Sequence, residues 1–145
     1  MSAEIEVVRE VSDEVVAALA RLLPQLSTTA KPLDHEAVAR LVASEATTVL
    51  VARVQGRIIG TLTLVVFPVP SGTRARVEDV VVDEAARGQG AAAALTDAAL
   101  ELARAAGART VDLTSRPSRA AANRLYERSG FQRRESTVYR FVLDR

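Results

Sequence analysis

Apolar and polar positions follow two kinds of pattern along the chain, and these patterns predict its strands and helices. Apolar residues alternate or run together in segments typical of strands, and recur every three or four residues in segments typical of amphipathic helices. The predicted strands span residues 4–9, 47–54, 57–67, 74–82, 110–114, 131–134 and 137–143. The predicted helices run from Ser12 to about Pro24, Asp34 to about Glu45, Gly90 to Gly107, and Ser118 to about Ser129.

The order of these elements, βααβββαβαββ, predicts the fold class. It is typical of an α/β (α+β) protein with a mixed, mostly antiparallel central sheet of about seven strands flanked by four helices. Gln55 and Gly56 separate two apolar runs and predict a tight hairpin, and residues 131–134 with 137–143 predict a closing hairpin. Because 145 residues without a linker or repeat suit one core, we expect a single domain over residues 1–145.

Composition limits the classes of function. The chain is 48% hydrophobic and 26% charged, which is typical of a globular protein, and it lacks both a long apolar run and a secretory signal pattern. We therefore expect a cytoplasmic protein with no membrane partner. A net charge of +1 and an aromatic content of 3% also argue against nucleic acid as a partner.

Cysteine is absent and His35 is the one histidine. Disulfides, thiolate nucleophiles and Cys/His metal sites are therefore excluded, and we expect no metal. The lone histidine, near the start of a predicted helix, is assigned no role. Any chemistry must rely on carboxylates, hydroxyls, arginines and the main chain.

The most informative segment joins a valine-rich strand to the longest predicted helix through the sequence Arg-Gly-Gln-Gly, residues 87–90. Glycines let main chain approach a ligand, and the unpaired N–H groups of a helix start suit a phosphate. The alternative is a loop whose glycines only make a turn. The segment also matches G-x-G-x-x-A with Asp112 downstream, but residues 83–87 separate it from the strand and an antiparallel meander precedes it, which argues against a dinucleotide fold.

Two motifs give the chain a resemblance to a known family. Arg87-x-x-Gly90-x-Ala92 resembles the pyrophosphate-binding signature of the GNAT superfamily of acetyl-CoA-dependent N-acetyltransferases, although glycine is frequent where Ala92 stands. Asn123-x-x-Tyr126-x-x-x-Gly130-Phe131 resembles the late motif of the same family. With the order of elements, the resemblance covers nearly the whole chain.

The resemblance implies acetyl-CoA as cosubstrate. The main chain of the valine strand is expected to pair with the pantetheine arm, in a gap between that strand and the strand at Val111, and the amides of the glycine loop to hold the pyrophosphate. The resemblance also gives Asn123 a part in orienting the cofactor. The residues assigned to the cofactor are Val80, Val81, Val82, Arg87, Gly88, Gln89, Gly90, Ala91, Ala92 and Asn123.

Amine acetylation requires removal of a proton. An amine with a pKa near 10.4 costs about 4 to 5 kcal/mol to deprotonate at neutral pH, so a base is useful. The resemblance implies Glu78 as general base and Tyr126 as the acid that protonates the departing thiolate. Asp79 is assigned to the substrate; it faces away from Glu78 in a regular strand, or toward the amine if a bulge intervenes. Whether Glu78, Asp79 or solvent is the base stays open, as does the alternative that both acids are merely solvated.

The acceptor is expected to be a primary amine of a small molecule, attacked directly in a ternary complex. A protein or peptide amine is the alternative within the enzyme class. A non-catalytic acetyl-CoA sensor is the alternative from another class, although Glu78 and Tyr126 weigh against it. The strand predicted at residues 137–143 makes a homodimer possible.

Overall fold

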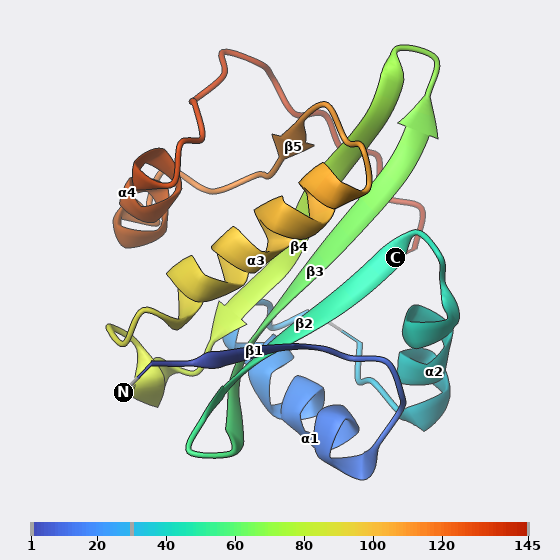
Figure 1. The fold of residues 1–145 in the computed structure, drawn as a ribbon, viewed down its shortest axis with the longest axis vertical. Coiled ribbons are helices and arrows are strands. Elements are labelled where there is room, and N and C mark those ends of the chain that lie inside the picture. The colour runs from blue at the N-terminus through green and yellow to red at the C-terminus, as the bar shows by residue number, and fades with distance from the viewer. Residues whose placement is uncertain (1, 30, 145) are drawn as a thin grey trace. The chain divides into compact units, whose positions relative to one another are not determined.

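The computed structural model describes residues 2–29 and 31–144 (Figure 1). The chain forms two compact units, Met1–Thr114 and Ser115–Arg145. The second unit contains α4 (Ala120–Arg128). The elements of the first unit are β1 (Glu4–Val7), α1 (Asp13–Leu22), the short 3-10 helix η1 (Leu23–Gln25), α2 (His35–Ala43), β2 (Thr47–Val54), β3 (Arg57–Val69), β4 (Gly72–Val82), the 3-10 helix η2 (Glu84–Ala86), α3 (Ala91–Ala105) and β5 (Val111–Asp112).

The sheet has the order β1-β2-β3-β4-β5. The first three pairings are antiparallel and the β4–β5 pairing is parallel, so the prediction of a mixed, mostly antiparallel sheet is confirmed. The β2–β3 hairpin is also as predicted. Its turn residues Gln55 and Gly56 have φ of 52° and 79°, the left-handed pair of a type I′ turn, which matches the twist of the flanking strands.

Helices cover both faces of the sheet (Figure 1). On one face, Leu95 and Ala99 of α3 pack in a core with Leu62 and other strand residues. On the other face, α1 and α2 pack against a second core that includes Val51 and Val81. Leu62 and Leu95 are fully buried, and burying one such side chain contributes about 1.5 to 3 kcal/mol. Two apolar cores therefore fix the sheet between helical layers.

The side chains predicted to begin α1 and α2 do so. The Val15 amide donates to Ser12 Oγ at 3.2 Å, and the Ala37 amide donates to Asp34 Oδ1 at 2.8 Å. These bonds satisfy amides that a helix start leaves without an intrahelical acceptor. The predicted boundaries of both helices are thus confirmed at their starts.

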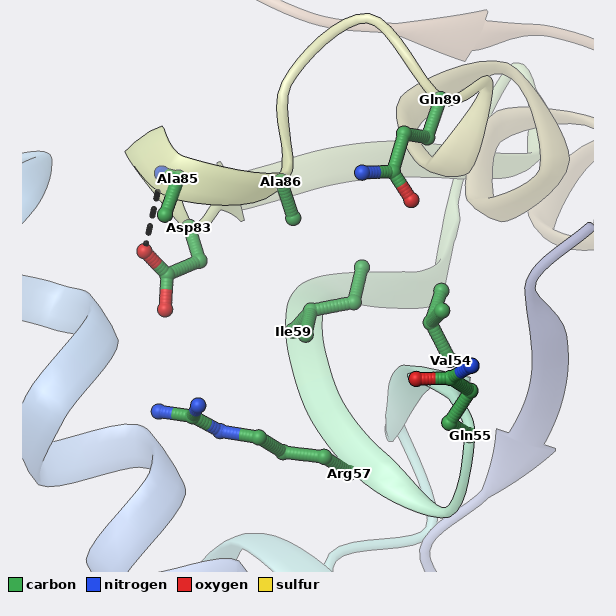
Figure 2. A pocket seen from close by; sticks show the side chains of 8 residues that line it. All are labelled: Val54, Gln55, Arg57, Ile59, Asp83, Ala85, Ala86 and Gln89. Atoms are coloured by element: carbon green, nitrogen blue, oxygen red, sulfur yellow. Dashed lines mark hydrogen bonds between the residues drawn. The ribbon is translucent and has the colours of Figure 1, made fainter. Parts of the chain in front are cut away.

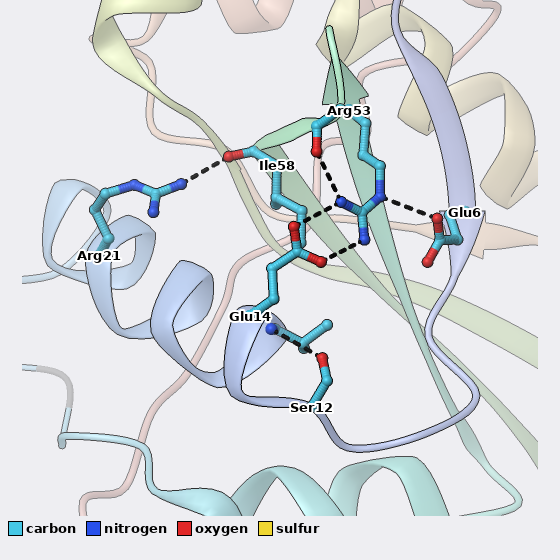
Figure 3. A network of polar contacts seen from close by, with 8 residues as sticks. Glu6, Ser12, Glu14, Arg21, Arg53 and Ile58 are labelled. Carbon is cyan, nitrogen blue, oxygen red and sulfur yellow. Dashed lines mark hydrogen bonds and ion pairs between the residues drawn. The ribbon is translucent and has the colours of Figure 1, made fainter.

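Arg53 of β2 connects this strand to α1 and β1 through hydrogen bonds (Figure 3). Its guanidinium donates two bonds of 2.8 Å to the Glu14 carboxylate on α1 and one of 3.0 Å to Glu6 on β1. The hydrogen bond from Arg53 lowers the pKa of Glu14 below its usual 4.5. This fork geometry orients α1 against the edge of the sheet.

The start of α4 differs from the prediction. Arg119, not Ser118, precedes the helix, and its side chain makes no cap. The Arg119 amide donates to the Arg116 carbonyl at 3.0 Å, which closes a turn with Pro117 and Ser118 at its centre. Proline favours the second position of such a turn. Ser118 is therefore used in the turn, and the predicted cap is wrong.

The predicted closing hairpin is wrong as well. Within residues 131–144 no strand forms, and five strands, not about seven, make up the sheet of the described residues. Tyr139, Phe141 and Leu143 are 91%, 83% and 91% exposed. An alternating pattern specifies faces, but a strand also needs a hydrogen-bonded neighbour, and none pairs with this segment. Within the described ranges, no helix has the length and apolar run that crossing a bilayer requires.

Candidate active site

Strand β4 contains a bulge at the position of the two predicted acids. Thr61 lies opposite Val81 and Thr63 opposite Glu78, so β4 has one extra residue in this stretch. Within the bulge Asp79 has φ of 48°, a left-handed conformation that aspartate tolerates better than most residues. The regular strand predicted through residues 74–82 is therefore interrupted at its centre.

The bulge changes which face of the sheet each side chain meets. Val77 packs in the core beneath α3, and Val80 packs against that same core, although a regular strand would put residues three apart on opposite faces. Val81, in turn, lies in the core beneath α1 and α2. The bulge thus shifts the alternation by one residue directly after Glu78.

Glu78 is held by an arginine that the sequence did not single out. Arg76 Nε lies 3.0 Å from Glu78 Oε2, and Arg76 also donates to Thr114 Oγ1 at 3.2 Å. The Glu78 side chain is 48% exposed. Residues two apart on one strand share a face, so an arginine two residues before the acid was the available signal for this partner.

Asp79 differs electrostatically from its neighbour. Although Asp79 is an exposed residue, nearby protein atoms displace part of the water around its carboxyl. This desolvation and, after it, the negative charge of Glu78 raise the pKa of Asp79 above its usual 3.8. A carboxyl whose pKa is raised by desolvation and by a neighbouring charge is typical of functional sites.

Among the described residues, no strand pairs with the outer edge of β4 in its second half. Strand β5 meets β4 only at Ala75 and Arg76. The Asp83 amide donates to the Ile59 carbonyl at 2.7 Å, so Asp83 and Val81 direct their main-chain groups toward β3. Alternation then directs the main-chain groups of Val80 and Val82 to the open edge, where an extended ligand has an N–H and C=O ladder to bind.

The glycine loop leads from this edge to the start of α3. Gly88 and Gly90 have φ of 85° and 81°, and a Cβ on either would meet no atom within 4 Å. The first intrahelical bond joins the Ala94 amide to the Gly90 carbonyl at 3.0 Å. The amides of residues 91–93 therefore have no acceptor in the helix, and together with the positive end of the α3 dipole they suit an anion.

These features fit a pyrophosphate attached to an extended arm. The free edge supplies main-chain partners for the arm, and the start of α3 supplies amides without an intrahelical acceptor, next to the open space beside Gly88 and Gly90. Among the predicted cofactor residues, Arg87 departs from this picture, because its amide donates to the Glu84 carbonyl at 3.4 Å. This long bond occupies the Arg87 amide, and the glycine loop itself begins at Gly88.

A cavity of about 360 Å³ lies beside the same loop, between η2 and the β2–β3 turn (Figure 2). Its lining is mixed, with the guanidinium of Arg57, the carboxylate of Asp83 and apolar groups such as Ile59. Gln89 is the member of the predicted cofactor set in this lining. The cavity therefore lies next to the proposed anion site and is distinct from the open edge of β4.

The second unit carries the other two predicted site residues. Partial burial of the phenol raises the pKa of Tyr126 above its usual 10.0, and the positive charge of Arg119 opposes this effect. The Tyr126 ring meets Phe131 edge-to-face with centroids 5.7 Å apart. Asn123 Nδ2 donates to the Arg116 carbonyl at 3.1 Å, so this amide stabilises the turn before α4.

Comparison with known proteins places the chain in a family. The model of the acetyltransferase (GNAT) family matches residues 13–131. No curated protein matches the chain. Among solved structures, an acetyltransferase from Trypanosoma brucei is 29% identical, with a TM-score of 0.79 over 97% of this chain and 100% of that one.

Two further structures are similar over almost their full lengths. A ribosomal-protein-alanine N-acetyltransferase from Brucella melitensis biovar Abortus 2308 is 25% identical, with a TM-score of 0.76 over 97% of this chain and 100% of that one. An aminoglycoside acetyltransferase from an uncultured soil metagenomic sample has a TM-score of 0.86 over 99% of this chain and 97% of that one, at 21% identity. The family match, the matching folds and the glycine loop at the start of α3 agree, and the chain belongs to the GNAT family of acetyltransferases.

Proposed function

We propose that the protein transfers the acetyl group of acetyl-CoA to a primary amine of a small molecule by direct attack in a ternary complex. The observation that carries this proposal is the continuity of one binding surface within the first unit. The edge of β4 at Val80 and Val82, which no described strand pairs, leads through the glycine loop to the amides at the start of α3 that lack an intrahelical acceptor. A pantetheine arm and its pyrophosphate have this same linear order.

The cofactor is proposed to be held mainly by main chain. Val80 and Val82 offer N–H and C=O groups to the pantetheine amides, as an added strand would use them. The amides from Gly88 to residue 93 bind the pyrophosphate, supported by the α3 dipole. When bound, acetyl-CoA supplies a thioester whose carbonyl carbon is attacked and whose sulfur leaves.

The acids of β4 are proposed to serve the amine. Glu78 removes the ammonium proton, directly or through one water, and Asp79 binds the cationic substrate. The raised pKa of Asp79 makes it the alternative base, since a base works best when its pKa approaches the working pH. Two carboxylates side by side favour a positively charged acceptor over a neutral one.

Tyr126 is proposed to protonate the leaving group. As the new C–N bond forms and the C–S bond breaks, the phenol donates its proton to the departing thiolate, and the phenolate takes up the second proton that the amine nitrogen loses as it becomes an amide. A pKa above 10.0 keeps this phenol protonated at neutral pH, as a proton donor requires. The chain contains no cysteine, so an acetyl-thioester intermediate on the protein is excluded.

The acceptor class is tested by calorimetric titration of acetyl-CoA together with thiol release across a panel of amines. The panel contains small polyamines, aminoglycosides, and peptides with an N-terminal alanine or an internal lysine. Binding with thiol release that depends on a small amine supports the proposal, whereas release with peptides alone identifies a protein acceptor. Binding without release from any amine indicates a sensor, and absence of binding contradicts the proposal.

A further inference from the structure

The segment between β4 and α3 has two parts with different hydrogen bonding. In the first part, the Glu84 amide donates to Gln25 Oε1 at 2.9 Å, and the Ala85 amide donates to Asp83 Oδ1 at 3.2 Å. The Ala86 amide donates to the Asp83 carbonyl at 2.8 Å. The second part, residues 88–90, contains the glycines and precedes the helix. The amides of residues 84–86 thus all have acceptors, and this part forms the base of the glycine loop.

Two side chains from the α1–η1 segment hold this base. Gln25, the last residue of η1, supplies the acceptor for the Glu84 amide. Arg21, in the last turn of α1, places Nε 3.8 Å from Asp83 Oδ2. Arg21 also donates from Nη2 to the Ile58 carbonyl at 2.6 Å, as Figure 3 shows. The Asp83 side chain is 17% exposed, so this ion pair is less screened by water than a fully exposed pair.

We propose that Arg21 and Gln25 are positioning residues for the glycine loop, and that they set the affinity for the cofactor's pyrophosphate. This inference rests on the proposed function. Glycines at residues 88 and 90 give the loop many conformations in the free protein, and selecting one of them costs binding free energy. A fixed base at Asp83 and Glu84 reduces that cost, because the loop then begins from one orientation.

The geometry separates this role from catalysis. The hydrogen-bond and ion-pair partners of Arg21 and Gln25 lie after β4, at Asp83 and Glu84, and on β3 at Ile58. Loss of either side chain is therefore expected to weaken cofactor binding while leaving the chemical step on the bound complex unchanged. A residue that acted on the reacting atoms would lower kcat instead.

The first test replaces the amide acceptor. Gln25→Leu leaves the Glu84 amide without its protein partner, and we expect CoA to bind about 5- to 10-fold more weakly by calorimetry, with kcat at saturation within about twofold. In the free protein, hydrogen exchange of the Glu84 amide is expected to accelerate roughly tenfold. Gln25→Glu keeps an acceptor oxygen and is expected to retain this protection.

The second test replaces the cation. Arg21→Gln removes the ion pair to Asp83, and we expect a similar loss of CoA affinity. Arg40→Gln is the matched control, because Arg40 makes an exposed ion pair of 3.6 Å with Glu36 on α2. This control is expected to leave CoA affinity unchanged. Melting temperatures without ligand show whether each variant is folded before affinities are compared.

The outcomes separate this inference from the proposed function. If the unmodified protein binds CoA, and Gln25→Leu and Arg21→Gln bind it equally well while folded, the positioning role is overturned and the proposed function stands. A lower kcat with unchanged affinity also overturns the positioning role. If the unmodified protein does not bind CoA, the proposed function fails first, and the inference fails with it.

Discussion

Strand β3 and residues 137–143 are both rich in apolar residues, but β3 is paired and buried whereas residues 137–143 are unpaired and largely exposed. In β3, Ile58 and Leu62 are buried on opposite faces of the sheet, and both edges of the strand are paired. In the later segment, Tyr139 and Leu143 are each 91% exposed. An apolar pattern therefore does not bury a segment by itself, because burial depends on neighbouring strands that the pattern does not supply. The two units differ in the same way. The first unit has two apolar cores, whereas none of the described residues of the second unit is buried.

The largest expected effect tests whether the first unit carries the proton-transfer step. Glu78→Gln keeps the shape of the side chain but removes the base, and we expect kcat for amine-dependent thiol release to fall about 10²- to 10⁴-fold. Asp79→Asn is measured in parallel to decide between the two acids. Glu36→Gln, on α2, is the control and is expected to be unchanged. If kcat of Glu78→Gln stays within twofold of the unmodified protein while kcat of Asp79→Asn falls, Asp79 is the base and Glu78 is not.

The next effect compares stability in the two regions. Leu62→Ala leaves a cavity in the core beneath α3 and is expected to lower the free energy of unfolding by about 2 to 5 kcal/mol. Phe141→Ala removes an 83% exposed ring and is expected to change it by less than about 0.5 kcal/mol. Urea unfolding of the protein without ligand measures both. A loss above about 2 kcal/mol in Phe141→Ala would show that this ring is buried in solution.

A smaller effect is expected at the proposed proton donor of the second unit. Tyr126→Phe keeps the ring that contacts Phe131 and removes the hydroxyl, so the fold should be preserved while kcat falls about 10²-fold, at the lower end for a positioned acid. Tyr139→Phe, at an exposed position, is the matched control. Equal rates for Tyr126→Phe and the control would remove Tyr126 from the mechanism.

The smallest effect concerns the pH dependence of stability at the bulge. Because the pKa of Asp79 is raised in the folded protein, the folded state binds more protons than the unfolded state at pH values between 3.8 and the raised pKa. The contribution of this group to stability therefore falls as pH rises through that window. Asp79→Asn, which also tolerates a left-handed conformation, is expected to be more stable than the unmodified protein at pH 7, with a gain that shrinks on acidification. A gain that grows on acidification would contradict the direction of the shift.

Much of the first unit was predictable from local signals. Ser12 and Asp34 begin the helices that they were predicted to begin, and Gln55 with Gly56 forms the predicted hairpin. These features depend on residues a few positions apart, so the sequence contains their full physical cause. The glycine loop before α3 was predictable for the same reason.

Features that depend on distant partners were not predictable. The segment VEDVVV gives no sign of the extra residue at Asp79, which arises from the pairing of β4 with β3. Nothing in the order of residues indicates that Arg21 forms an ion pair with Asp83, because the two residues are far apart in the sequence. The cap that Asp83 makes with the Ala85 amide is local, and an aspartate before a short helical turn was a signal for it. The hairpin predicted within residues 131–144 does not form for the same reason, because a strand needs a hydrogen-bonded neighbour as well as an apolar pattern.

The central claim is that the cofactor lies along the open edge of β4 and on the amides at the start of α3. Its most direct test is an amide NMR titration of the unmodified protein with CoA. The account predicts large shifts for Val80, Val82 and the amides of residues 88–93, with smaller ones at Glu84. Shifts confined to the cavity beside Arg57, or no shifts at all, would contradict it.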